Sequence, residues 1–153
     1  MESLTYSQAL QRIKSYCAYQ ERCHSEVRKK LFSFKQTSQE IDTIISELIK
    51  ENYLNEERFA IEFAGGKFRM KKWGKNRIAM ALKQKEISDY CIQKALKQIE
   101  DKDYDKTFKA LAEKKRISLK SEKNIFIRKR KIRDYLIAKG YSFDLINKYL
   151  NQL

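Results

Sequence analysis

Apolar residues recur at intervals of three and four along most of this chain, the spacing that places them on one face of a helix. Ala9, Leu10 and Ile13 begin the pattern within residues 7–20. The same spacing predicts helices over residues 25–34, 38–51, 56–71, 76–85, 104–115 and 122–139. The apolar residues of segment 117–121 keep no period, so we expect a loop there.

Polar residues stand where these helices should begin and end. Thr37 precedes Glu40 by three residues, the spacing of a capping box. Ser88 and Ser142 precede the two remaining predicted helices and can cap them. Gly140 follows the long basic stretch and suits a left-handed helix end.

Three parts of the chain can be aligned on one order of apolar and capping positions. Leu31, Leu82 and Leu136 serve as the reference positions, and a capping residue stands six residues after each. The aligned apolar residues before and after them are Val27, Ile41 and Ile45; Ile78, Ile92 and Leu96; and Ile132, Ile146 and Leu150. We therefore predict an all-α fold, an elongated tandem array of three-helix repeats over residues 7–54, 55–101 and 102–153.

Some positions carry more specific expectations. Ile41, Ile44, Ile45, Leu48 and Ile49 should face the core from one helix. Gly65 and Gly66 interrupt another predicted helix and favour a kink or a close helix contact. Trp73 stands at a helix junction, where packing into the core is expected and stacking on a base or an Arg is the alternative.

Composition supports the helical prediction and bears on partners. The 153 residues include 42% hydrophobic residues, four Gly and no Pro, which favours helices over an all-β fold. The formal net charge of +14 predicts attraction to polyanions or acidic surfaces, and solubility alone is the competing explanation.

Two stretches rich in cations are candidates for binding a partner or nucleic acid through phosphate neutralisation. The first flanks Trp73 and contains Lys67, Arg69, Lys71, Lys72, Lys75 and Arg77. The second includes Lys114, Lys115, Arg116, Lys120, Lys123, Arg128, Lys129, Arg130, Lys131 and Arg133. A third stretch, residues 40–62, has seven acids against Lys50 and Arg58 and could meet a protein surface.

Catalytic and metal chemistry find little support. His24 is the only His, and a surface position at a helix start is its simplest interpretation. Cys17, Cys23 and Cys91 form no CxxC pair, so reduced thiols are expected and a zinc cluster is not. No cofactor is expected, and the absence of a long apolar run or a signal-peptide pattern predicts a cytoplasmic protein that does not enter the membrane.

The most specific motif of the chain comprises Tyr53, Leu54, Arg58, Phe59, Trp73, Gly74, Ile78 and Leu82. In this motif the chain resembles the RecX family of regulatory proteins. Lys75 and Glu86 depart from the Pro and Gly that are usual in the family at those positions. The resemblance extends from about Tyr6 to Leu150 and implies three tandem three-helix repeats.

The resemblance also implies a role. Members of this family bind the filament of the RecA recombinase on DNA and modulate, most often inhibit, its ATPase and strand exchange. The expectation is thus a monomeric, non-enzymatic regulator with weak non-specific DNA binding. The alternatives are a helix-turn-helix DNA-binding protein or an RNA-binding protein that acts through its basic helices.

Overall fold

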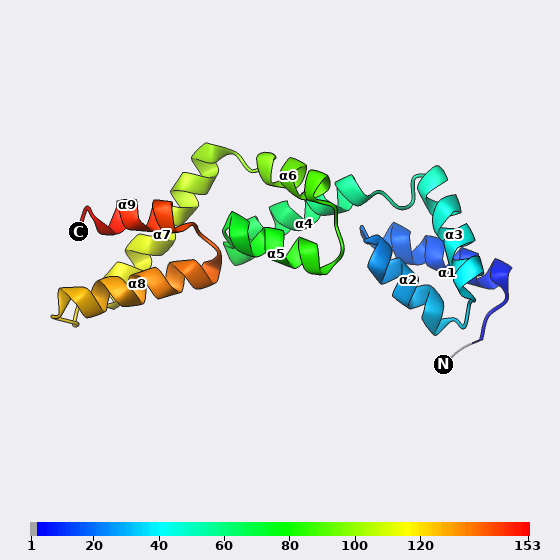
Figure 1. Cartoon of the computed structure of the whole chain (residues 1–153), viewed down its shortest axis with the longest axis horizontal. Helices are drawn as coiled ribbons and strands as arrows, with labels where there is room; N and C mark the ends of the chain where they lie inside the picture. Colours follow the sequence, from blue (N-terminus) through cyan, green and yellow to red (C-terminus); the bar gives the residue numbers. More distant parts are fainter. Residues whose placement is uncertain (1–2) are drawn as a thin grey trace. The chain divides into compact units, whose positions relative to one another are not determined.

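The computed structural model describes residues 3–153, and within them it contains helices and no strands (Figure 1). In chain order the helices are α1 (Tyr6–Tyr19), α2 (His24–Ser33), α3 (Ser38–Lys50), α4 (Glu56–Lys71), α5 (Lys75–Gln84), α6 (Asp89–Lys97), α7 (Asp101–Ser118), α8 (Ile125–Lys139) and α9 (Phe143–Leu150). The all-α class predicted from apolar spacing is confirmed.

The helices form two compact units. Unit 1 comprises the residues up to Glu62 together with Leu82–Lys94, and unit 2 comprises Phe63–Ala81 together with Ala95–Leu153. Because α4, α5 and α6 each contribute residues to both units, these compact units differ from the three segments predicted by the repeat. The boundaries at residues 54/55 and 101/102 stay a prediction.

Unit 1 has a core built by α1, α2 and α3, which pack against one another. Ile13, Val27, Leu31 and Ile44 are fully buried there, as the helical spacing predicted. Ile49 is 47% exposed, so its predicted inward position is wrong. It lies in the last turn of α3, where the chain turns away toward Asn52.

Unit 2 has a second core where α8 packs against both α7 and α9. Phe108, Ile132, Leu136 and Ile146 are buried in it. The predicted cap Ser142 accepts a hydrogen bond from the backbone N–H of Leu145 at 3.3 Å. The capping sites therefore fix the start of α9 as the sequence indicated.

The turn between α7 and α8 differs from the sequence prediction. The segment expected to be a loop from residue 117 is helical through Ser118, and α8 begins at Ile125 instead of residue 122. Ile117 is 52% exposed, so helix continues there without a buried apolar face. Asn124 sets the start of α8, because its side chain accepts from the N–H groups of Phe126 and Ile127.

The Gly pair does not interrupt a helix. α4 runs through Gly65 and Gly66 to Lys71. A Cβ at Gly66 would meet no heavy atom within 4 Å, and the three heavy atoms nearest to one at Gly65 all belong to the side chain of Arg69, on the same helix. The expected interruption and close helix contact are therefore wrong, and α4 tolerates the low helix propensity of both residues.

The second helix of each aligned segment ends in the same hydrogen-bonded turn. Four residues after the reference Leu, the backbone enters the left-handed region, with φ of 61° at Lys35, 63° at Glu86 and 104° at Gly140. In each turn the next backbone N–H donates to the carbonyl of the reference Leu, the bond that defines a Schellman motif. The three bonds join Gln36 to Leu31, Ile87 to Leu82 and Tyr141 to Leu136.

Candidate nucleic-acid interface

The net charge of the chain belongs to unit 2. Unit 2 holds 22 Lys and Arg against 8 Asp and Glu, which leaves +14, whereas unit 1 holds 12 of each and is neutral. Both basic stretches singled out in the sequence lie in unit 2. Unit 2 is therefore the part of the molecule whose electric field attracts polyanions.

Trp73 lies in the first basic stretch, at the turn between α4 and α5, and two cations of that stretch contact its ring. Lys67 Nζ lies 5.1 Å and Arg77 Cζ lies 4.3 Å from the centroid of its ring. The side chain is only partly buried, so the expected core position is wrong. Its ring stacks against an Arg of the same chain, the alternative that the sequence left open.

A close backbone contact joins this turn to the end of α8. The N–H of Gly74 donates to the carbonyl of Lys139 at 2.7 Å, and the N–H of Asn76 donates to the carbonyl of Gly140 at 3.0 Å. A Cβ at Gly74 would lie 2.4 Å from the carbonyl carbon and oxygen of Gly140. Glycine at residue 74 is what permits these two backbones to pair.

Long polar side chains reinforce the same contact. Arg77 donates to the carbonyl of Ala138 at 3.1 Å, and Lys139 Nζ donates to the carbonyl of Lys71 at 3.3 Å. The hydroxyl of Tyr141 donates to the carbonyl of Lys72 at 2.8 Å. The contact thus holds the first basic stretch beside the C-terminal end of α8.

Two tyrosines support the contact, of which Tyr141 is buried and Tyr104 is partly buried. The Tyr141 and Tyr104 rings lie 5.3 Å apart, and Tyr104 stacks on Phe68 with 5.8 Å between centroids. The hydroxyl of Tyr104 accepts from the N–H of Lys75 at 2.9 Å. Burial raises the pKa of both tyrosine hydroxyls, so both remain protonated in the physiological range. The spacing of apolar residues gave no indication that Tyr104 and Tyr141 would meet here.

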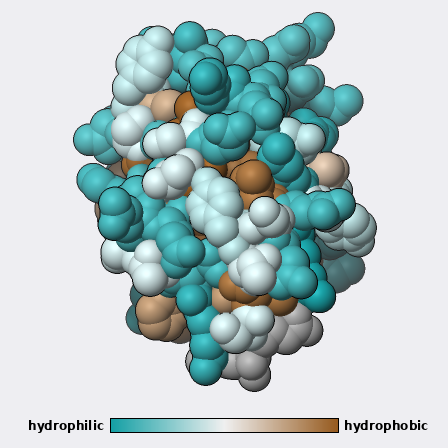
Figure 2. Space-filling view, turned by 90° about the vertical axis from the view of Figure 1, so that its right-hand side faces the viewer, coloured by the Kyte–Doolittle hydropathy of each residue, from teal (hydrophilic) through white to brown (hydrophobic). Residues whose placement is uncertain are grey.

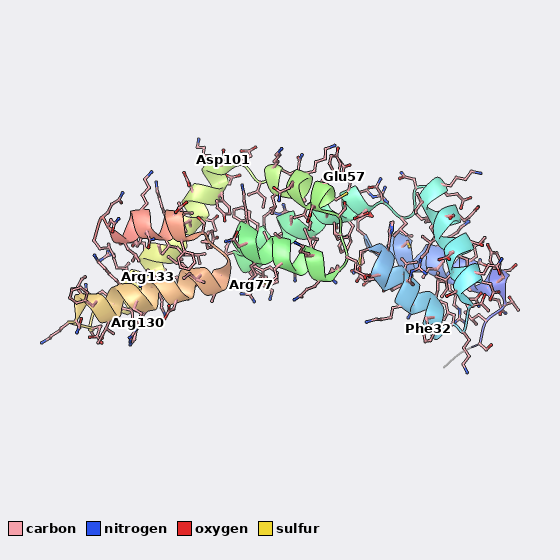
Figure 3. The ribbon with its side chains drawn as sticks, viewed as in Figure 1. Phe32, Glu57, Arg77, Asp101, Arg130 and Arg133 are labelled. Carbon is pink, nitrogen blue, oxygen red and sulfur yellow. The ribbon has the colours of Figure 1, made fainter. Side chains whose placement is uncertain are left out.

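The second basic stretch is divided between structural and exposed cations. Arg128 donates from Nε and NH2 to the carbonyl of Glu122, at 3.1 and 2.7 Å, and thereby closes the turn before α8. Arg130, Lys131 and Lys123 are exposed, with Lys123 in the turn itself, and Lys129 and Arg133 are partly exposed. Figure 3 shows Arg130 on α8 and Arg77 on α5 at the side of unit 2 opposite Asp101.

The cations of the first stretch also differ in what they contact. Arg69 and Lys71 are exposed at the end of α4. Lys72 Nζ donates to the carbonyl of Arg69 at 2.9 Å, and Lys75 Nζ lies 4.9 Å from the centroid of the Tyr104 ring. Lys72 and Arg77 are exposed too, but their side chains and that of Lys75 already have contacts within unit 2. Arg69 and Lys71 are therefore better suited to an external partner.

The motif residues in unit 1 have structural roles. Leu54, Phe59 and Leu82 are buried, and Tyr53 is partly buried. Arg58 pairs with Glu21 and donates to the side-chain and backbone oxygens of Asn52, both at 3.1 Å. Arg58 thus ties the start of α4 to the end of α1 and to the turn after α3.

The acidic stretch, residues 40–62, makes many contacts within unit 1. Carboxylates of this stretch pair with Lys14, Arg28 and Lys94 at 2.8, 3.0 and 3.1 Å. Two more accept backbone N–H groups, Glu40 from Thr37 at 2.9 Å and Glu56 from Ser88 at 2.6 Å. The side of unit 1 seen in Figure 2 is largely hydrophilic, with hydrophobic residues showing only in small areas. Five of the seven carboxylates of this stretch therefore already have partners within unit 1.

Among residues 3–153, the requirements of a metal site and of a membrane span are not met. They contain no group of three His, Cys, Asp or Glu side chains placed to hold a metal ion. His24 is partly exposed at the first position of α2, and the three Cys are buried with free thiols. None of the described helices combines the length and the apolar character needed to cross a bilayer.

Comparisons with known proteins agree with these features. Profiles described as the second and the third three-helix domains of RecX match residues 55–96 and 102–150, which together are more than half of the chain. The regulatory protein RecX of Lactococcus lactis subsp. lactis is 33% identical over 147 residues, covering 90% of this chain and 52% of that protein. The regulatory protein RecX of Bacillus cytotoxicus is 29% identical over 141 residues, covering 91% and 51%. The chain thus spans about half the length of these curated relatives.

Solved structures share the same arrangement. The crystal structure of RecX from Lactobacillus salivarius superposes with a TM-score of 0.86 at 28% identity, covering 97% of this chain and 96% of that chain. A second crystal structure, of a regulatory protein RecX, gives a TM-score of 0.84 at 23% identity, covering 93% and 70%, and supports the fold alone. The chain belongs to the RecX family of regulatory proteins.

Proposed function

We propose that this protein binds the filament that a RecA-type recombinase forms on DNA and lowers the ATPase and strand-exchange activities of that filament. Family membership supports the recombinase as partner. The observation that carries the proposal is the charge of unit 2, which holds the whole +14 excess of the chain. A nucleoprotein filament presents a regular array of phosphates, which such a field attracts.

The proposed action requires no chemical step by the protein itself. Phosphate neutralisation by Arg and Lys supplies affinity along the strand, and contacts with the recombinase supply selectivity. We propose that the protein is a non-enzymatic regulator that acts as a monomer in the cytoplasm. Bound along the filament, the protein hinders the conformational changes of the recombinase that accompany ATP hydrolysis.

The direct test is the DNA-stimulated ATPase of the cognate recombinase, measured with increasing amounts of this protein. Inhibition is expected at near-stoichiometric levels. If the recombinase does not bind the protein and its rate of ATP hydrolysis does not fall, the proposal is wrong.

A pair of charge-reversal variants locates the interface. Arg130→Glu with Lys131→Glu changes two exposed cations of unit 2, and inhibition should fall at least about tenfold, since two side chains that attract phosphates then repel them. Lys50→Glu with Lys83→Glu makes the same charge change on exposed cations of unit 1 and should leave inhibition nearly intact. Equal losses in both variants would show that net charge alone governs binding. Lys72 and Arg77 are unsuitable for charge reversal, because their side chains donate hydrogen bonds within unit 2.

A further inference from the structure

A groove of about 650 Å³ lies over α1 and α2 in unit 1, outside the basic surface of unit 2. Figure 1 shows the two helices next to each other. The described residues that line the groove include no Asp or Glu. Its cationic and aromatic lining consists of Arg12, Arg22, Lys30, Tyr16, Tyr19 and Phe34.

The inner wall of the groove is a stack of cations on aromatic rings. Arg22 Cζ lies 3.7 Å from the centroid of the Tyr16 ring, and its Nε donates to the carbonyl of Tyr16 at 3.0 Å. Lys30 Nζ lies 5.5 Å from the same centroid and 5.6 Å from that of Phe34. These contacts hold both cations in place while leaving most of their N–H groups able to meet an anion.

Tyr19 forms the open edge of the groove. It is 83% exposed, at the last position of α1, and its ring centroid lies 6.0 Å from Arg22 Cζ. An exposed ring beside fixed cations is an arrangement that stacks a nucleobase while the cations meet the adjoining phosphates.

The carboxylates nearest to the groove in sequence have other partners. Glu26 accepts the N–H of Cys23 at 3.0 Å at the start of α2. Glu21 pairs with Arg58 at the start of α4. Because the described lining residues include three cations and no carboxylate, the local charge of the groove is positive, although unit 1 as a whole is neutral.

We propose that this groove binds single-stranded DNA, with a base stacked on Tyr19 and phosphates held by Arg22 and Lys30. The single strand follows from the exposed ring, because the bases of a duplex are already stacked on each other. The choice of DNA over RNA rests on the proposed function. A strand site on unit 1 would let the chain contact a filament through unit 1 as well as through unit 2.

The test measures binding of the full-length chain to a fluorescent oligothymidylate and to a duplex, with no recombinase present. Tyr19→Ala should weaken single-strand binding by about 5-fold or more, since base stacking on one aromatic ring is worth at least about 1 kcal/mol. Duplex binding, which unit 2 provides, should change less than about twofold. Tyr19→Phe keeps the ring and should retain single-strand affinity.

Tyr90→Ala is the matched control. Tyr90 is 67% exposed and also belongs to unit 1, but it lies on α6 and does not line the groove. Equal effects of Tyr19→Ala and Tyr90→Ala, or an equal loss of duplex and single-strand binding, would overturn the proposal. So would a Tyr19→Ala chain that loses affinity for oligoglutamate but not for oligothymidylate, because the groove would then take acidic peptide.

A parallel binding measurement with oligouridylate distinguishes a site for DNA from a site for RNA. Stronger binding of oligouridylate than of oligothymidylate, lost in Tyr19→Ala, would contradict the assignment to DNA. Since the recombinase is absent from all arms, failure here leaves the proposed function standing. Failure of the ATPase test likewise leaves the result for strand binding standing.

Discussion

At the scale of single residues, the three equivalent helix ends show what side chains the fold tolerates. Lys35, Glu86 and Gly140 occupy the same left-handed position, with φ of 61°, 63° and 104°. A side chain in this conformation costs about 1 kcal/mol, which glycine avoids. Glu86 and Lys35 are exposed, so their side chains do not offset that cost by burial.

Glu86→Gly should therefore raise the free energy of unfolding by about 0.5 kcal/mol, after the greater unfolded-state entropy of glycine is subtracted. Urea denaturation followed by circular dichroism measures the change. Gly140→Ala at the equivalent position should act in the opposite direction, because its Cβ would lie 2.5 Å from Arg77 Cβ. A loss of stability in Glu86→Gly would mean that the Glu86 side chain stabilises the turn.

Gly74→Ala should lower the free energy of unfolding by about 3 kcal/mol. Its Cβ cannot fit 2.4 Å from the Gly140 carbonyl, so the paired backbones must separate and the bonds to Lys139 and Gly140 are lost. Thermal unfolding provides the measurement. The control is Gly66→Ala within α4, where a Cβ meets nothing within 4 Å and should stabilise the protein by about 1 kcal/mol. A mild effect at Gly74 would show that the contact can open without cost.

At the scale of helices, the sequence predicted where most helices lie, but it did not predict which of them contact each other. Apolar spacing placed the helix cores and the reference residues Leu31, Leu82 and Leu136, all fully buried. The capping residues gave the starts of α3 and α9 because their hydrogen bonds are local. The pairing of Gly74 with Gly140 was not predictable, because residues distant in sequence leave no periodic signal of which backbones approach. The same limit hid the groove over α1 and α2, whose lining comes from two helices.

The α5 helix provides a test of the core assigned from that spacing. Leu82→Asp places a carboxylate at a fully buried position and should lower the free energy of unfolding by about 3 to 5 kcal/mol. Chemical denaturation measures the loss. Met80→Asp lies on the same helix at a side chain that is 65% exposed, and it should cost less than about 1 kcal/mol. Similar losses for both would mean that helix propensity, and not burial, holds α5.

At the scale of the whole molecule, charge is segregated between the two units. Composition gave the +14 excess, but it could not show that unit 2 holds all of it while unit 1 balances 12 cations with 12 acids. The tertiary structure makes this division, since α4, α5 and α6 contribute residues to both units. Non-specific binding to duplex DNA should therefore be a property of unit 2.

This segregation predicts how binding to duplex DNA responds to salt. The logarithm of the binding constant should fall linearly with the logarithm of salt concentration, by about 0.9 for each phosphate contacted. Arg130→Ala with Lys131→Ala should reduce that slope by about 1 to 2. Without these two exposed cations the protein neutralises fewer phosphates, so fewer counterions leave the DNA on binding. Lys50→Ala with Lys83→Ala, which removes two exposed cations of unit 1, should leave the slope unchanged. Fluorescence anisotropy across a salt series gives both slopes, and equal reductions would place the phosphate contacts on both units.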